Sequence, residues 1–121
     1  VPVAFIFIRP QRYTYQFTEN EKYFTLTFFE EKDREILNFC GSTSGKYVNK
    51  IEKTGLIPLE TENKNVYFKQ ARLVIECEKL YSDFIDPQGF TSNEIPENIY
   101  PKNDFHKMYI GKILKVLVRE N

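Results

Sequence analysis

The chain has 121 residues, of which 41% are hydrophobic and 16% aromatic, so it has the size and composition of one folded domain and is not a disordered protein. Lys plus Arg and Asp plus Glu both number 17, so no overall charge draws the chain to nucleic acid or to an acidic membrane surface. No apolar run is long enough to span a bilayer and no signal segment is apparent, so we expect a cytoplasmic protein.

The first predicted element is the run "VPVAFIFI", residues 1–8. It is apolar on both faces, which predicts a strand that is covered on both sides. Pro10 ends the strand. Residues 14–22 then predict a short helix, with Thr14 as its N-cap and Glu19 on its polar side.

The middle of the chain predicts one strand and two short helices. Thr and Phe alternate in "YFTLTFFE", residues 23–30, as in a half-buried strand. Residues 31–41 have the apolar spacing of a helix and end on Gly41, which suits a C-terminal cap. A polar turn and a second short helix are predicted within residues 42–56.

Two strands are predicted in the second half. In residues 71–81 apolar and charged residues alternate, so that Cys77 lies on the apolar side and Glu76 on the polar side. Residues 107–120 form the clearest strand of the chain, in which Gly111 indicates a bulge or a close backbone approach. Between these strands lies a long loop rich in Pro, Asn and Asp. The chain is therefore predicted to be one mainly β domain with short helices.

Two segments contain residue types that bind anions. In "RPQRYTYQF", residues 9–17, the guanidinium groups of Arg9 and Arg12 match the geometry of phosphate oxygens, and Thr14 adds a hydroxyl. In "CGSTSGKYVNK", residues 40–50, small residues and Lys46 form a polar turn that lacks the spacing of a P-loop. Taken alone, each segment is more simply interpreted as a solvated surface turn.

Other kinds of site have little support in the sequence. His106 is the only histidine, so no set of metal ligands is formed, and no G-x-S-x-G elbow accompanies it. Cys40 and Cys77 are far apart and lack C-x-x-C spacing, which favours two buried free thiols over a zinc or redox pair. The acidic residues are spread along the predicted helices and strands, which is the usual pattern of a solvent-exposed face and gives no pair of catalytic carboxylates.

The succession of "RPQRYTYQF", "CGSTSGKYVNKIEKTGL" and "HKMYIGKILKV" resembles the flavin reductase-like family of FMN-binding split barrels, with the flavoredoxin-type branch most similar. The order and separation of the three segments match that family over nearly the whole chain. The resemblance implies a mainly β fold, an antiparallel split barrel that forms a homodimer with FMN near the subunit interface. It also implies FMN as the cofactor and NAD(P)H as a co-substrate.

The resemblance also implies a set of site residues. The first segment would hold the FMN phosphate or its ribityl end through Arg9, Gln11, Arg12 and Thr14. The second segment would complete the phosphate side through Ser44, Gly45, Lys46 and Lys50. His106 precedes the last strand, where a histidine of some relatives lies near the flavin or the nicotinamide, and it is the candidate catalytic residue. The loop from Phe84 to Phe105 is expected to cover the flavin or to reach across the dimer.

Three functions are compatible with these features. The first is an FMN flavoprotein in electron transfer, either an NAD(P)H:flavin oxidoreductase or a flavoredoxin-like carrier with a redox partner protein. The second is a non-enzymatic split-barrel dimer that has lost flavin binding and serves as an interaction module, because the family's N-terminal portion along the flavin ring is not seen before Val1. The third is a barrel for another ligand, of the pyridoxal phosphate or haem type.

Overall fold

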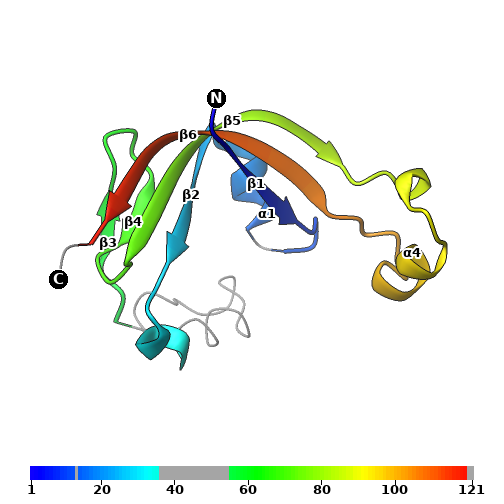
Figure 1. Ribbon diagram of the computed structural model, residues 1–121, viewed down its shortest axis with the longest axis horizontal. Coiled ribbons are helices and arrows are strands. Elements are labelled where there is room, and N and C mark those ends of the chain that lie inside the picture. The colour runs from blue at the N-terminus through cyan, green and yellow to red at the C-terminus, as the bar shows by residue number, and fades with distance from the viewer. Residues whose placement is uncertain (13, 36–54, 120–121) are drawn as a thin grey trace.

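A curled antiparallel sheet forms the centre of the computed structural model, which describes residues 1–12, 14–35 and 55–119 (Figure 1). Its strands are β1 (Val3–Ile8), β2 (Tyr23–Phe28), β5 (Leu73–Phe84) and β6 (Lys107–Val118). They lie in the order β1-β6-β5-β2. The long strands β5 and β6 pair along their whole length, with two register irregularities, and curve as an arch that makes a half-barrel (Figure 1). The prediction of a mainly β, antiparallel split-barrel fold is confirmed.

The remaining elements are short. They are α1 (Tyr15–Asn20), the 3-10 helix η1 (Glu31–Asp33), β3 (Pro58–Glu60), β4 (Val66–Phe68), the 3-10 helix η2 (Pro87–Gly89) and α4 (Glu94–Ile99). Strands β3 and β4 pair as a separate hairpin that the sequence reasoning did not predict. The segment between β5 and β6 carries η2 and α4 and extends away from the sheet (Figure 1). None of the described helices is long and apolar enough to cross a membrane.

The core lies where β2, β5 and β6 meet. Cys77 and Tyr109 are completely buried and Phe24 is nearly so. A Cβ on Gly111 would lie 2.5 Å from Phe24 Cζ and 2.8 Å from Cys77 Cβ, so only glycine lets the strands approach this closely. The predicted close backbone approach at Gly111 is therefore confirmed.

The outer face of the sheet is less covered than the sequence predicted. On β1 the side chains of Val3, Phe5 and Phe7 are 39%, 53% and 52% exposed, so the prediction of a strand covered on both sides is wrong. Its apolar residues alternate between a half-buried inner side and this exposed outer side. On β6 the outer-face neighbours of β1 are Met108, Ile110 and Lys112, whereas Tyr109 and Gly111 between them are buried.

Glu76 is buried, although β5 alternates as predicted, with Cys77 paired to Phe24 and Glu76 paired to Thr25 of β2. The register of β5 against β6 shifts between Glu76 and Cys77, and both residues are buried. The Glu76 carboxylate accepts hydrogen bonds from Asn63 Nδ2 (3.0 Å) and Asn65 Nδ2 (2.8 Å) in the turn between β3 and β4. Burial raises the pKa of Glu76, but hydrogen bonds from Asn65, Thr61 and Asn63 outweigh it and hold the pKa below the ordinary value. The turn between β3 and β4 thus covers the polar face of β5, which was expected to be exposed to solvent, and supplies hydrogen-bond donors to its carboxylate.

The helix predictions are confirmed only in part. Helix α1 follows Thr14, as predicted, but ends at Asn20. Glu19 was predicted to lie on the polar side of the helix, but its side chain contacts Tyr109 of β6. The predicted helix at residues 31–41 begins with η1, and its remainder and the predicted helix within residues 42–56 lie mostly outside the described residues.

Candidate functional site

The turn that follows β1 is held by the segment that precedes β6. Arg9 Nη2 donates a 2.8 Å hydrogen bond to the carbonyl of Ile99, at the end of α4. Arg9 Nη1 lies 3.5 Å from Asp104 Oδ2, and the guanidinium carbon lies 5.0 Å from the centre of the Tyr100 ring. Arg9 therefore contacts a carbonyl, a carboxylate and an aromatic face at once, which fixes its orientation.

Asp104 also binds the next polar residue of the same turn. Gln11 Nε2 donates a 2.6 Å hydrogen bond to Asp104 Oδ2, the oxygen that faces Arg9. Burial raises the pKa of Asp104, but the backbone N–H, Gln11 and the charges of Arg9 and Lys102 outweigh it and hold the pKa below its usual value. Asp104 is thus ionised at neutral pH, and its negative charge lies among the residues that were predicted to bind an anionic ligand.

His106 is a neutral part of this cluster. Its Nδ1 is 2.5 Å from the Tyr100 hydroxyl, and the two rings meet edge to face. Burial lowers the pKa of His106, the charges of Arg9 and Arg12 lower it further, and Asp104 opposes them. In a neutral imidazole one ring nitrogen donates and the other accepts, so His106 offers a hydrogen-bonding Nε2 opposite the nitrogen that contacts Tyr100.

Two aromatic rings, those of Phe90 and Phe105, pack against Tyr100. The centres of the Tyr100 and Phe105 rings are 4.6 Å apart, and Phe90 lies 6.3 Å from Tyr100. Tyr100 is consequently buried, and its hydroxyl is fixed against His106. The loop between β5 and β6 therefore packs on the turn that contains Arg9 and Gln11.

Arg12 and Thr14 are the exposed members of the turn. Thr14 occupies the N-cap position of α1, but its side chain makes no capping hydrogen bond. Within the described part of the chain, the Arg12 guanidinium forms no ion pair or hydrogen bond. Its positive charge nevertheless contributes to the lowered pKa of His106. A guanidinium and a hydroxyl that none of the described side chains binds are suited to bind an anionic ligand.

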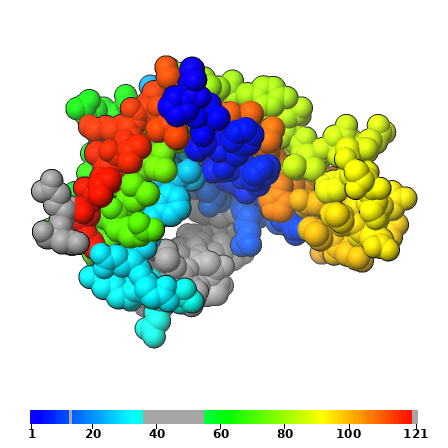
Figure 2. Space-filling model, in the orientation of Figure 1, coloured from blue at the N-terminus to red at the C-terminus, as the bar shows by residue number. Residues whose placement is uncertain are grey.

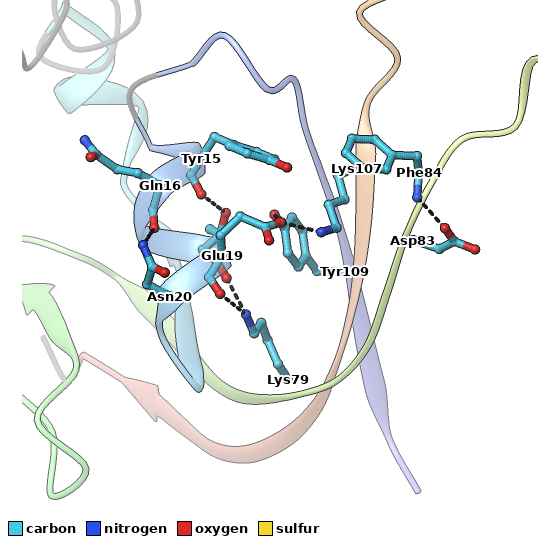
Figure 3. A network of polar contacts seen from close by, with 10 residues as sticks. Tyr15, Gln16, Glu19, Asn20, Lys79, Asp83, Phe84, Lys107 and Tyr109 are labelled. Carbon is cyan, nitrogen blue, oxygen red and sulfur yellow. Dashed lines mark hydrogen bonds and ion pairs between the residues drawn. The ribbon is translucent and has the colours of Figure 1, made fainter.

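A second polar network fixes α1, and with it the end of the turn, against the sheet (Figure 3). Tyr109 Oη donates to Glu19 Oε1 (2.6 Å), and Lys107 Nζ lies 2.5 Å from the same oxygen. Lys79 Nζ donates to the carbonyls of Thr18 (2.5 Å) and Glu19 (3.2 Å). Strands β5 and β6 thereby anchor the helix that begins at the candidate site.

The structure brings part of the predicted site together. Arg9, Gln11 and His106 converge through Asp104 and Tyr100. Arg12 and Thr14 lie on the same turn and face solvent, whereas the predicted contacts Ser44, Gly45, Lys46 and Lys50 lie outside the described residues. Sequence reasoning did not assign Asp104 and Tyr100 to this cluster, because no spacing rule links them to residues some 90 positions earlier.

Other chemistry is not supported by the described residues. Among them no group of three or more His, Cys, Asp or Glu side chains is placed to hold a metal ion. Cys77 is a free thiol, and burial raises its pKa, as expected for an unreactive core cysteine. Cys40, the other cysteine, lies outside the described residues.

Comparison with solved structures identifies the fold. An FMN-binding protein from Thermus thermophilus, crystallised with p-hydroxybenzaldehyde, matches with a TM-score of 0.74 and 18% identity, covering 98% of this chain and 56% of that one. The flavoredoxin of Desulfovibrio vulgaris (Miyazaki F) matches at 0.73 and 21% identity, covering 98% and 54%. Component B of nitrilotriacetate monooxygenase from Bacillus cereus matches at 0.73 and 16% identity, covering 98% and 55%. The chain thus spans about half the length of these similar structures.

Comparison of sequences identifies the family. No curated protein matches the chain. The family model described as the flavin reductase like domain matches residues 2–121, which is nearly the whole sequence. This chain belongs to the flavin reductase-like domain family.

Proposed function

We propose that the chain binds FMN and takes part in electron transfer, as an NAD(P)H:flavin oxidoreductase or as a flavoredoxin-like carrier. One observation carries the proposal. In a chain that the family model matches over residues 2–121, the turn at residues 9–14 presents a guanidinium and a hydroxyl that no other described side chain binds, and a fixed neutral histidine lies in the same cluster. When bound, FMN would supply the redox chemistry, and the protein would bind and orient it.

The donor set of this turn fits a phosphate group. A phosphate monoester carries about −1.5 to −2 charges at pH 7 and accepts several hydrogen bonds. Arg12 and Thr14 offer a charged fork and a hydroxyl at the surface. Arg9 and Gln11 are engaged by Asp104, so we propose that they shape the turn while Arg12 and Thr14 bind the phosphate. The resemblance adds Ser44, Gly45, Lys46 and Lys50 as further proposed contacts.

His106 is proposed to donate a hydrogen bond toward the flavin or the nicotinamide. Tyr100 occupies its Nδ1 and fixes the ring, and burial, together with the charges of Arg9 and Arg12, lowers the pKa of the imidazole and favours its neutral form. The group is therefore suited to orient a ligand as a neutral donor and is poorly suited to transfer a proton as an imidazolium at neutral pH.

Titration of the purified chain with FMN, followed by flavin fluorescence, tests the proposal. Binding should be saturable, and Arg12→Gln should weaken it by about tenfold because a charge-assisted hydrogen bond is lost. Lys69→Gln removes the same charge from an exposed position after β4 and is the matched control, with an expected change below about twofold. Absence of any saturable FMN binding, or equal effects of both substitutions, would contradict the proposal.

We also propose that a second copy of the chain covers the outer face of the sheet. Phe5 and Phe7 of β1 lie on this face, where β1 and β6 are adjacent at the surface (Figure 2). This supports a homodimer formed through the sheet.

A further inference from the structure

The ionised carboxylate of Asp104 lies in the cluster that is proposed to bind the negatively charged phosphate of FMN. Its Oδ2 accepts from Gln11 and lies 3.5 Å from Arg9 Nη1. The side chains of Arg9 and Asp104 are only 27% and 22% exposed, so solvent screens the pair less than a surface pair. The carboxylate therefore compensates the Arg9 charge locally.

We propose that Asp104 sets how strongly the site discriminates between phosphorylated and unphosphorylated flavin, by cancelling the positive charge of Arg9 beside Arg12. This inference rests on the proposed FMN binding, which it deepens. With Asp104 ionised, the three side chains Arg9, Arg12 and Asp104 carry one net positive charge. Without the carboxylate they would carry two, while the Arg9 and Gln11 side chains would remain on the same turn.

The effect on affinity follows from the charges alone. A phosphate dianion near this cluster gains attraction when a nearby carboxylate is neutralised, whereas riboflavin, which has no phosphate, gains none. For charges separated by about 6–8 Å in a partly solvated site, this amounts to about three- to tenfold in the dissociation constant. The ratio of the FMN and riboflavin affinities therefore reports the charge and not the general integrity of the fold.

The variant Asp104→Asn separates charge from structure. The Asn side-chain oxygen can still accept from Gln11, so the loop retains a hydrogen bond while the charge is lost. Asp104→Glu keeps the charge and changes only the length of the side chain. Glu62→Gln, in the exposed turn between β3 and β4, removes a carboxylate at a position outside the cluster and is the matched control.

The experiment is the titration of all four proteins with FMN, riboflavin and inorganic pyrophosphate by calorimetry, with melting temperatures measured in parallel. We expect Asp104→Asn to tighten FMN and pyrophosphate binding about three- to tenfold and to change riboflavin binding by less than about twofold. Asp104→Glu and Glu62→Gln should preserve the wild-type ratio of FMN to riboflavin affinity.

The outcomes distinguish this inference from the proposed function. If the wild-type chain binds FMN but Asp104→Asn leaves the ratio unchanged, or weakens both flavins equally, Asp104 is only structural and the inference is overturned. If no flavin binds to any variant, the proposed function fails. In that case tighter pyrophosphate binding by Asp104→Asn still supports the charge effect, and equal pyrophosphate binding overturns it.

Discussion

The hydroxyl of Tyr109 donates a 2.6 Å hydrogen bond to Glu19 Oε1 and thereby joins β6 to α1 across 90 positions of the sequence. Lys107 reaches the same carboxylate oxygen from the first residue of β6. Because α1 begins directly after the turn at residues 9–14, these contacts fix the position of the candidate phosphate-binding residues relative to the sheet (Figure 3).

Tyr109→Phe is expected to destabilise the chain by about 1–3 kcal/mol, because it removes a hydrogen-bond donor of the partly buried Glu19 carboxylate. Urea unfolding measures the change. Tyr67→Phe, on β4, is the control, since its hydroxyl makes no hydrogen bond within the described ranges, and it should cost less than about 0.5 kcal/mol. Equal stability of Tyr109→Phe and the wild type would show that the contact does not hold the helix.

The ion pair of Glu19 should make the fold sensitive to acid. The hydrogen bond from Lys107 and that from Tyr109 lower the pKa of Glu19 from its ordinary value of 4.5, although burial opposes them. A lowered pKa means that the stabilisation is present above pH 4.5 and is lost as the pH falls through the native value. Glu19→Gln should therefore have a lower melting temperature at pH 7 but a smaller further loss between pH 5 and about pH 3.

Melting temperatures recorded across this pH range measure the effect. Glu76, Glu30 and Asp104 also have lowered pKa values, so the wild type and Glu19→Gln should both lose stability in acid, with the variant losing less. The exposed Glu62→Gln should follow the wild-type curve. A Glu19→Gln curve parallel to that of the wild type would exclude this carboxylate as an acid-sensitive contact.

Much of the sheet could be predicted because its strands carry local signals. Alternating residues predict β2 and β5, and apolar residues in phase along residues 107–120 predict β6. The β3–β4 hairpin has strands of only three residues and was missed, since so short a pattern carries little periodicity. The alternation of β5 was predicted correctly, but Glu76 is buried because the turn between β3 and β4, which no local pattern of β5 shows, packs on its face of the strand.

The site was predicted through resemblance more than through spacing. The sequence shows that Arg9 and Arg12 lie in one turn and could act on the same anion. It does not show that Asp104 forms an ion pair with Arg9. That contact depends on how the loop between β5 and β6 packs against the end of β1, which is a tertiary event. The resemblance placed Gln11 among the ligand contacts, whereas the structure shows its amide bound to Asp104.

Gly111→Ala is expected to destabilise the chain by about 1–3 kcal/mol through overpacking. The added Cβ would lie 2.8 Å from Cys77 Cβ, an atom fixed to the backbone of β5, so the strands would have to separate. Gly89→Ala in η2 is the matched control, because no atom lies within 4 Å of its added Cβ. Urea unfolding of the two variants should show a loss for the first alone; similar curves would mean that the β5–β6 pair is less tightly packed than the structure shows.

The proposed dimer leads to a prediction about the outer face of β1. Phe5 and Phe7 are each about half exposed, and their cross-strand neighbours on the same face are Ile110 and Met108. Burying this apolar surface against a second copy would favour association, and two lysines there would oppose it by bringing unpaired charges into the interface. We therefore expect the wild type to sediment as a species of twice 14.4 kDa and Phe5→Lys/Phe7→Lys to sediment as a monomer.

Sedimentation velocity over a range of concentrations measures the association, with circular dichroism confirming that the double variant is folded. Val66→Lys introduces a charge at a similarly exposed apolar residue, on the separate β3–β4 hairpin, and should leave the dimer intact. A monomeric wild type at all concentrations would contradict the dimer itself. A dimeric double variant would instead place the interface elsewhere, because two lysines at its centre would cost several kcal/mol on burial.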